Sequence, residues 1–161
     1  MVQHLRTKII GLAAILGTLL FTSTAWSDNL TEQPQITPEL ITQLKSKSNS
    51  GDHDATCKLA DLYRKGNGIN KDLTIAFDLY AEAAREGHPM ARYRLGSAYH
   101  KGEGTESNQI SAWIWLTLAS EDDSPVKAEA LQLREKVSRS LTEAQQDRAQ
   151  VLANNFREMF Y

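Results

Sequence analysis

The sequence predicts an all-α protein: a short α/α solenoid of two full helix-pair repeats, a degenerate third unit and capping helices. Three observations support this fold class. Residues 55–84 align with residues 91–120 at a constant offset of 36 residues, and a fixed period in this range is typical of stacked supersecondary units. Apolar residues recur at helical spacing within each copy. Glycines and polar cap residues separate the predicted helices at the same positions in both copies.

Residues 1–27 have the features of a secretory signal peptide. Arg6 and Lys8 precede an uncharged apolar run over residues 9–21, which is shorter than the roughly 20 residues that a membrane span needs. We predict cleavage after Ser27, where Ala25 and Ser27 are small residues two apart; cleavage after Ala25 is the second choice and an uncleaved signal anchor the alternative. The expected location is the periplasm of a Gram-negative bacterium or the external medium, with no stable membrane span after cleavage.

The composition of the remaining chain excludes one class of partner and one means of stabilisation. Without Arg6 and Lys8 the chain keeps 16 basic and 20 acidic residues, a balance that argues against nucleic acid as a partner. Cys57 is the only cysteine, so no disulfide can form within the chain, although pairing with another chain stays open. The fold must therefore be held together by packing.

Residues 28–51 are predicted to form a leader and a short capping helix. Thr37 is a suitable N-cap and Pro38 suits the first helical position. Leu40, Ile41 and Leu44 then lie on one face of that helix at helical spacing. This apolar face is expected to cover the first end of the repeat stack.

Residues 52–120 are predicted to hold the two complete repeats, each a pair of helices. In the first repeat, one helix runs from about Asp54 to Lys65 and ends at Gly66, and a second helix is capped by Asp72 and ends at Gly87. The matching start, stop and cap signals of the second repeat are Pro89, Gly102 and Asn108.

Small and aromatic residues at equivalent repeat positions predict how the helices pack. Ala60 and Gly96 lie one period apart, and their small size is expected to let paired helices approach closely. Tyr63 and Tyr99, which are also one period apart, are expected to be buried between helices.

Residues 121–161 are predicted to form the degenerate third unit and a C-terminal capping helix. Pro125 keeps the period, but no Gly-x-Gly follows, so the helix is expected to continue to about Ser140. Ser124 is expected to be its N-cap. Thr142 and Gln145 form a capping box at the start of the last helix.

The repeated pattern is Ala-x3-Leu-Ala/Gly-x2-Tyr-x2-Gly-x-Gly, then a cap, an Ala-aromatic pair and Ala-Ala. Over about residues 52–158 it resembles the Sel-one-like repeat (SLR) family, relatives of tetratricopeptide repeats, and residues 141–145 look like the closing helix after bacterial SLR arrays. The resemblance implies an α/α superhelix that binds proteins, often in bacterial envelopes. The residues that carry it, with their partners in 91–120, are Ala55, Leu59, Ala60, Tyr63, Gly66, Gly68, Asp72, Ala76, Ala83, Ala84 and Gly87.

Motifs that could carry chemistry are few. Ser124 and Lys127 match a Ser-x-x-Lys nucleophile motif. Because cysteine-rich relatives have been described as β-lactamases or penicillin binders, a cell-wall-directed hydrolase or penicillin-binding activity is the alternative function. The Ser-Asp-Asn and Lys-Thr-Gly motifs are missing, however. His53 and Cys57 have metal-ligand spacing and lie beside Asp52 and Asp54, but no second His or Cys lies near them in sequence. We therefore predict that the protein is not an enzyme and has no catalytic residue, metal or cofactor.

The predicted function is that of an exported interaction module, which binds an envelope-associated protein or peptide on the concave face of the repeat stack. A purely structural subunit of an assembly is a third possibility. Trp115 is considered as an additional exposed aromatic contact. By analogy with tetratricopeptide stacks, the first helix of each repeat lines the concave face. The partner-binding residues expected there are Cys57, Asp61, Arg64, Tyr93, Ser97 and His100.

Overall fold

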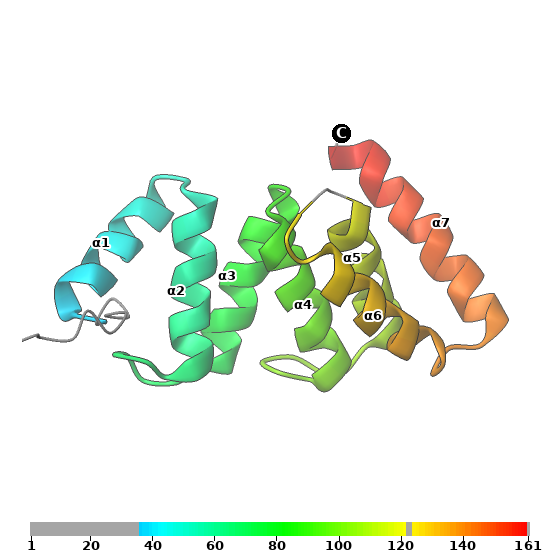
Figure 1. Cartoon of the computed structure of the whole chain (residues 1–161), viewed down its shortest axis with the longest axis horizontal. Coiled ribbons are helices and arrows are strands. Elements are labelled where there is room, and N and C mark those ends of the chain that lie inside the picture. Colours follow the sequence, from blue (N-terminus) through cyan, green and yellow to red (C-terminus); the bar gives the residue numbers. More distant parts are fainter. Residues whose placement is uncertain (1–35, 122–123, 161) are drawn as a thin grey trace, which may run out of the picture. The chain divides into compact units, whose positions relative to one another are not determined.

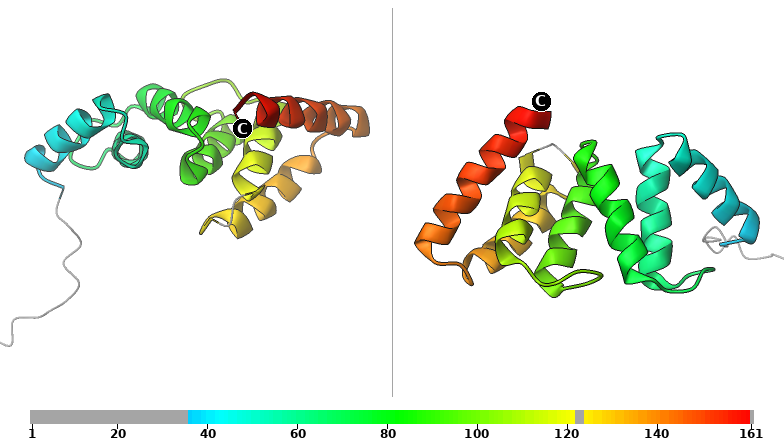
Figure 2. Two further views of the ribbon diagram at one scale, coloured as in Figure 1. Left: turned by 90° about the horizontal axis from the view of Figure 1, so that it is seen from above. Right: turned by 180° about the vertical axis from the view of Figure 1, so that it is seen from behind.

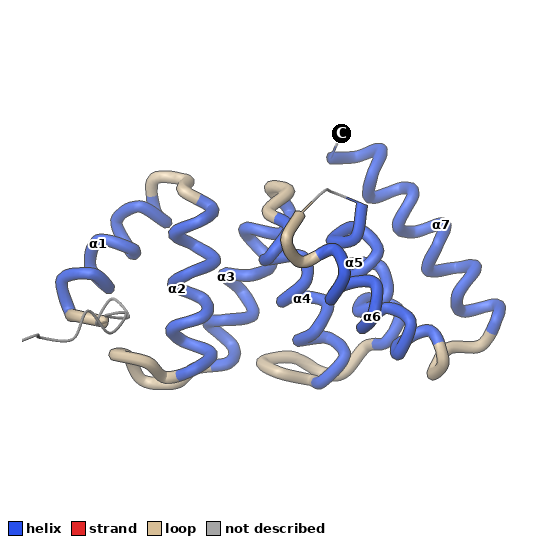
Figure 3. The backbone as a smooth tube through the Cα atoms, in the orientation of Figure 1, coloured by secondary structure: helices blue, strands red, loops and turns tan. Residues whose placement is uncertain are grey.

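The computed structural model describes residues 36–121 and 124–160, and within them the chain forms seven helices and no strand. Figure 1 shows these helices following one another along the chain, and Figure 3 shows the short loops that join them. The predicted signal peptide lies outside the described residues. The helices are α1 (Pro38–Asn49), α2 (His53–Lys65), α3 (Leu73–Arg85), α4 (Pro89–Lys101), α5 (Gln109–Glu121), α6 (Lys127–Ser138) and α7 (Glu143–Phe160).

Each helix from α1 to α5 packs against the next, and α7 packs on α5. The two repeats are thus the helix pairs α2–α3 and α4–α5. The two further views in Figure 2 show α3 and α5 in one layer with α7, while α4 and α6 lie toward the other side. Helix α5 contacts α4, α6 and α7, and is therefore covered on several sides. Among the described residues, none of the helices is both long and apolar enough to cross a membrane.

Polar side chains cap the first three repeat helices, and one of these caps, Asp72, is the one that the sequence predicts. The Asp52 side chain accepts a hydrogen bond from the Ala55 amide at 2.9 Å, so α2 begins one residue earlier than expected. Asp72 caps α3 by accepting from two backbone amides. His88 caps α4 through Nδ1, which lies 3.1 Å from the Ala91 amide nitrogen. Sequence reasoning did not identify that histidine cap.

Two glycines that end the first helices of the repeats adopt the same left-handed conformation. Gly66 and Gly102 both have φ of 72°, a conformation that residues with a Cβ adopt only with strain. Their backbone amides donate to Leu62 and Ala98, respectively, at 2.8 Å. The predicted glycine turns are therefore confirmed, and they fix the same reversal of chain direction in both repeats.

Close packing between α4 and α5 depends on Gly96. A Cβ atom at this position would lie 2.7 Å from Leu116 Cγ and 3.2 Å from the Ala112 carbonyl oxygen. No side chain fits that space without movement of the helices. The expected close approach at Gly96 is thus confirmed.

The main hydrophobic cluster extends over α2 to α7, while α1 packs on α2 through a second cluster that includes Ile41 and Leu44. Tyr63 and Tyr99 are half-buried and pack against the main cluster. Trp115 is only 8% exposed, and its ring lies 5.7 Å from that of Phe156 on α7. The expectation of an exposed Trp115 is therefore wrong, because α7 covers this side of α5.

The start of the third unit differs from its prediction. Helix α6 begins at Lys127, its cap position is Val126, and no side chain caps it. Ser124 does not act as the N-cap, and its buried hydroxyl has no hydrogen-bond partner among the described residues. The helix ends at Ser138, slightly earlier than expected.

The capping box of α7 is confirmed. The backbone N–H of Gln145 donates to Thr142 Oγ1 at 3.3 Å, and the backbone N–H of Thr142 donates to Gln145 Oε1 at 2.9 Å. Further along α7, Arg157 forms an ion pair with Glu121 at the end of α5. Apolar packing and an ion pair thus both hold α7 against α5.

Candidate functional site

A pocket of about 470 Å³ lies between α4 and α6. Helix α4 contributes Tyr93, and the remaining lining residues belong to α6 or follow it directly. On α6 these residues recur at spacings of three and four, so they form one face of the helix. We call this surface the α4–α6 groove; its residues are Tyr93, Glu129, Gln132, Leu133, Glu135, Lys136 and Arg139.

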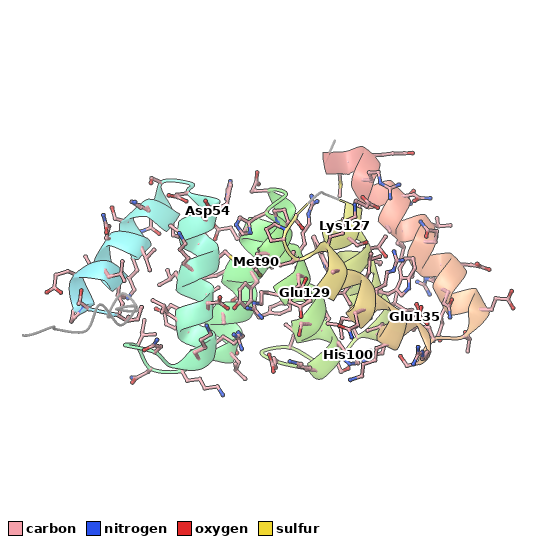
Figure 4. The ribbon with its side chains drawn as sticks, in the orientation of Figure 1. Asp54, Met90, His100, Lys127, Glu129 and Glu135 are labelled. Atoms are coloured by element: carbon pink, nitrogen blue, oxygen red, sulfur yellow. The ribbon has the colours of Figure 1, made fainter. Side chains whose placement is uncertain are left out.

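The α4–α6 groove combines an apolar floor with charged sides. Tyr93 and Leu133 are half-buried and pack against the main hydrophobic cluster. Glu129 and Lys136 are exposed, and Arg139 Nη2 lies 3.4 Å from Glu135 Oε1. Figure 4 labels Glu129 and Glu135 on α6 and His100 at the lower end of α4. Such a surface can contact an apolar side chain while forming hydrogen bonds to polar groups beside it.

The repeat period relates the groove to the residues predicted from sequence. Glu129, Leu133 and Lys136 follow Tyr93, Ser97 and His100 by one period of 36 residues. These α6 residues could not be recognised as repeat positions from the glycine and tyrosine landmarks, because the third unit lacks both. The period itself was the signal that could have found them.

Two arginines and a tyrosine meet around the carboxylate of Asp61. Asp61 Oδ1 accepts a hydrogen bond from the Tyr80 hydroxyl at 2.5 Å. The same oxygen lies 3.4 Å from Arg64 Nε and 3.4 Å from Arg94 Nε. We call Asp61, Arg64, Tyr80 and Arg94 the Asp61 cluster. It joins α2, α3 and α4, and its charged side chains are 26–28% exposed.

Tyr80 remains a neutral hydrogen-bond donor within this cluster. Burial and, secondly, the hydrogen bond to Asp61 raise the pKa of the Tyr80 hydroxyl well above its ordinary value. The hydroxyl also accepts a hydrogen bond from Arg64 Nε at 3.2 Å. One phenol therefore bridges the carboxylate and a guanidinium.

The six residues predicted to bind a partner occupy different environments. Asp61 and Arg64 belong to the Asp61 cluster, and Tyr93 lines the groove. His100 is half-buried, with Nδ1 2.7 Å from Gln109 Oε1. Cys57 and Ser97 are only 4% and 9% exposed. Because both side chains are buried among the packed helices, a partner on the surface cannot readily contact them.

Burial also determines the chemistry of Cys57. It raises the pKa of the thiol from 9.0 to about 12, and the nearby Asp61 carboxylate adds to the effect. Because the thiolate is the reactive form of cysteine, this thiol is a poor nucleophile and is poorly placed to pair with another chain.

We expect native Cys57 to react with a thiol reagent at pH 8 at least tenfold more slowly than an exposed thiol, because burial both raises its pKa and shields the sulfur from the reagent. Unfolding in urea should restore the ordinary rate. The control is Cys57→Ser combined with Lys58→Cys, which moves the thiol to the exposed neighbouring position on α2. Equal rates for native Cys57 and the control would contradict the burial of this side chain.

The geometry around Ser124 gives no support to the alternative hydrolase function. His88 and Ser124 line the same small pocket. However, His88 Nδ1 accepts from the Ala91 amide, and Nε2 lies 2.9 Å from Asp54 Oδ1. Both ring nitrogens are therefore engaged, and neither is available to activate the serine hydroxyl.

The predicted metal-ligand spacing of His53 and Cys57 does not correspond to an assembled site. Within residues 36–121 and 124–160, no three or more His, Cys, Asp and Glu side chains are grouped so that they could hold a metal ion. His53 Nδ1 is buried and has no hydrogen-bond partner in the same part of the chain.

Comparison with known proteins relates both helix pairs to one family. A family model described as Sel1 repeat matches residues 53–88 and residues 89–124. Each match takes in one complete pair, α2 with α3 and α4 with α5. The matched repeats thus include the Asp61 cluster and Tyr93, whereas the α6 side of the groove lies after them.

Two solved structures extend the similarity beyond the matched repeats. One is a protective antigen present in uropathogenic Escherichia coli strains that displays an SLR fold; it is 26% identical, with a TM-score of 0.70. The match covers 74% of this chain and 25% of that chain. The other is a Sel1 repeat protein from Oxalobacter formigenes, which is 31% identical with a TM-score of 0.54. That match covers 58% of this chain and 37% of that chain, so the chain spans well under half the length of either protein. These similarities confirm the predicted solenoid fold.

Proposed function

Because this chain is a Sel1 repeat protein, we propose that it binds a segment of another protein in the α4–α6 groove. Sel1 repeats generally act as protein-interaction modules, and stacked helical repeats bind partners on extended surfaces. The observation that carries the proposal is the groove of about 470 Å³ that Tyr93 and one face of α6 line together. Its half-buried floor and charged sides suit a peptide segment better than a small apolar ligand.

We place this activity in the bacterial envelope. The support comes from the sequence alone: Arg6 and Lys8, the apolar run over residues 9–21, and the small residues Ala25 and Ser27. The partner is then another envelope protein, or a segment of one that reaches the same compartment.

A charge-swap experiment tests the groove. Glu129→Lys combined with Lys136→Glu keeps the net charge and alters two exposed side chains of the groove. We expect the unfolding free energy to change by less than about 0.5 kcal/mol, as for other exposed positions. Recovery of the partner with a C-terminally tagged protein from an envelope extract should fall at least tenfold. N-terminal sequencing of the recovered chain tests export, and it should begin at Asp28 or, as second choice, at Trp26.

A matched control uses the outer side of α7. Asp147→Lys combined with Arg148→Glu makes the same swap at two exposed residues outside the groove, and should leave recovery unchanged. If the control loses the partner and the groove variant keeps it, α7 is the interaction surface. If neither variant loses it, the groove does not bind the partner.

A further inference from the structure

The Asp61 cluster has more positive than negative charge. Two guanidinium groups, Arg64 and Arg94, share the single carboxylate of Asp61. Both contact the same oxygen at 3.4 Å, which is long compared with about 2.7–2.9 Å for a charge-assisted hydrogen bond. That oxygen already accepts the short hydrogen bond from Tyr80. Arg64 donates to that oxygen from Nε and Nη2 and to the Tyr80 hydroxyl from Nε, so one carboxylate oxygen serves two guanidinium groups and a phenol.

Arg94 shows this excess most clearly. Its Nε is buried and lies 3.4 Å from Asp61 Oδ1, but it forms no hydrogen bond with that oxygen or with any other acceptor in the described part of the chain. The long contact with Asp61 therefore engages the Arg94 guanidinium only weakly, and its other N–H groups can donate to a ligand. At the same time 28% of the side chain is exposed, so a ligand can reach the guanidinium.

The cluster is continuous with the proposed binding surface. Arg94 follows Tyr93 on α4, and its guanidinium carbon lies 5.7 Å from the centre of the Tyr93 ring. Tyr93 lines the α4–α6 groove. A peptide segment that contacts Tyr93 in the groove can therefore place a neighbouring side chain beside Arg94.

We propose that Arg64 and Arg94 bind a carboxylate of the segment held in the α4–α6 groove, supplied by an Asp or Glu side chain within a few residues of the one that contacts Tyr93. A carboxylate matches the planar fork of donors on a guanidinium and would balance the positive charge that Asp61 leaves uncompensated. The inference rests on the proposed function, because it names the chemistry of the segment that the groove binds.

Selection from a random peptide library displayed on phage tests this chemistry without knowledge of the natural partner. The peptides selected by the wild-type protein should be enriched in Asp or Glu. Synthetic versions with amidated C-termini exclude a contribution from a terminal carboxylate. Replacing the acidic residue with Asn or Gln should weaken binding about tenfold, the effect of losing one charge-assisted hydrogen-bonded pair. In Arg94→Gln the difference between acidic and neutral peptides should become much smaller, because only Arg64 remains to bind the carboxylate, whereas the α7 control Arg148→Gln should keep the full difference.

Asp61→Asn separates ligand binding from a structural role, and covers the case in which Arg94→Gln does not fold. Removing the internal carboxylate should leave both guanidinium groups to the ligand. We therefore expect the acidic peptide to bind several-fold more tightly, while the affinity of the neutral peptide stays the same. If the cluster only crosslinks α2, α3 and α4, Asp61→Asn should lower stability and change both affinities by the same factor, which would refute the proposal.

The same selections distinguish failure of this inference from failure of the proposed function. Peptides that need the groove but show no preference for acidic residues would overturn the inference alone. A peptide needs the groove if it no longer binds the variant that combines Glu129→Lys with Lys136→Glu. If the groove variant binds every selected peptide as tightly as the wild type, or if no peptide is selected, the proposed function is wrong and the inference fails with it.

Discussion

Replacing Gly104 with alanine should destabilise the protein by roughly 3–4 kcal/mol. Gly104 has φ of 76°, which is unfavourable for residues with a Cβ. In addition, a Cβ atom at this position would overlap the carbonyl group of Leu73 at the start of α3 and would lie 3.0 Å from Phe77 Cβ. Backbone atoms of a packed helix cannot move aside as the end of a flexible side chain can. The turn after α4 and the start of α3 would therefore be forced apart, and the midpoint of urea unfolding should fall sharply.

Gly51→Ala is the matched control. Gly51 also has positive φ, at 87°, but a Cβ there would meet no atom within 4 Å. This substitution should cost only the strain of the left-handed conformation, about 1 kcal/mol. Both variants reduce the entropy of the unfolded chain to a similar extent, so this effect cancels between them. Equal unfolding midpoints for the two variants would show that the contact between the α4–α5 turn and α3 is not tight.

Replacing Trp115 with alanine should cost about 3–5 kcal/mol, the range for truncating a buried tryptophan. The side chain is 8% exposed and packs against Phe156, so the substitution leaves a cavity between α5 and α7. Because α7 packs chiefly on α5, hydrogen exchange in α7 should increase more than exchange in α2 and α3. Urea unfolding and hydrogen exchange followed by mass spectrometry measure these two effects.

Val151→Ala tests the opposite side of α7. Val151 is 58% exposed, so its truncation should change stability by less than about 0.5 kcal/mol. A Trp115→Ala variant as stable as Val151→Ala would mean that α7 does not cover α5 in solution. The Arg157–Glu121 ion pair would not compensate for the lost packing, because partly exposed pairs contribute little.

The local features of the repeats could be predicted from the sequence because they depend on neighbouring residues. Asp72 caps α3 through amides two and three residues further on. Gly66 ends α2 because its own backbone conformation allows the turn. The same reasoning identified Thr142 and Gln145 as a capping box. In each case the interacting groups lie within one helical turn, so the order of residues determines the structure.

The environment of α5 could not be predicted in this way. Its sequence is apolar on more than one side, and an all-round apolar helix is buried in the core of a protein. Helical spacing alone left Trp115 open as an exposed contact. Only the position of α7, far along the chain, decides that Trp115 is covered. Ser124 was also misassigned as a cap: α6 begins at Lys127, and no side chain caps it.

The candidate site was predictable only in part. The repeat alignment placed Tyr93 and Arg64 on the first helices of the repeats, where the structure has Tyr93 in the groove and Arg64 in the Asp61 cluster. It could not show that Cys57 and Ser97 are buried. A helical period gives the direction of a side chain, but not whether a neighbouring helix covers it. It also could not reveal Arg92, which is 1% exposed and donates from Nε to the Ala84 carbonyl oxygen at 3.2 Å.

The sequence by itself thus determined the helix pairs, their caps and turns, and the type of fold, since these follow from local conformation and from a pattern repeated every 36 residues. The tertiary structure decided which surfaces remain open. It brought α6 beside Tyr93 to form the groove, and it gathered Asp61, Arg64, Tyr80 and Arg94 from three helices around one carboxylate. Such meetings depend on the spacing and angle between helices, which arise from the packing of many side chains at once and are not encoded in any single segment.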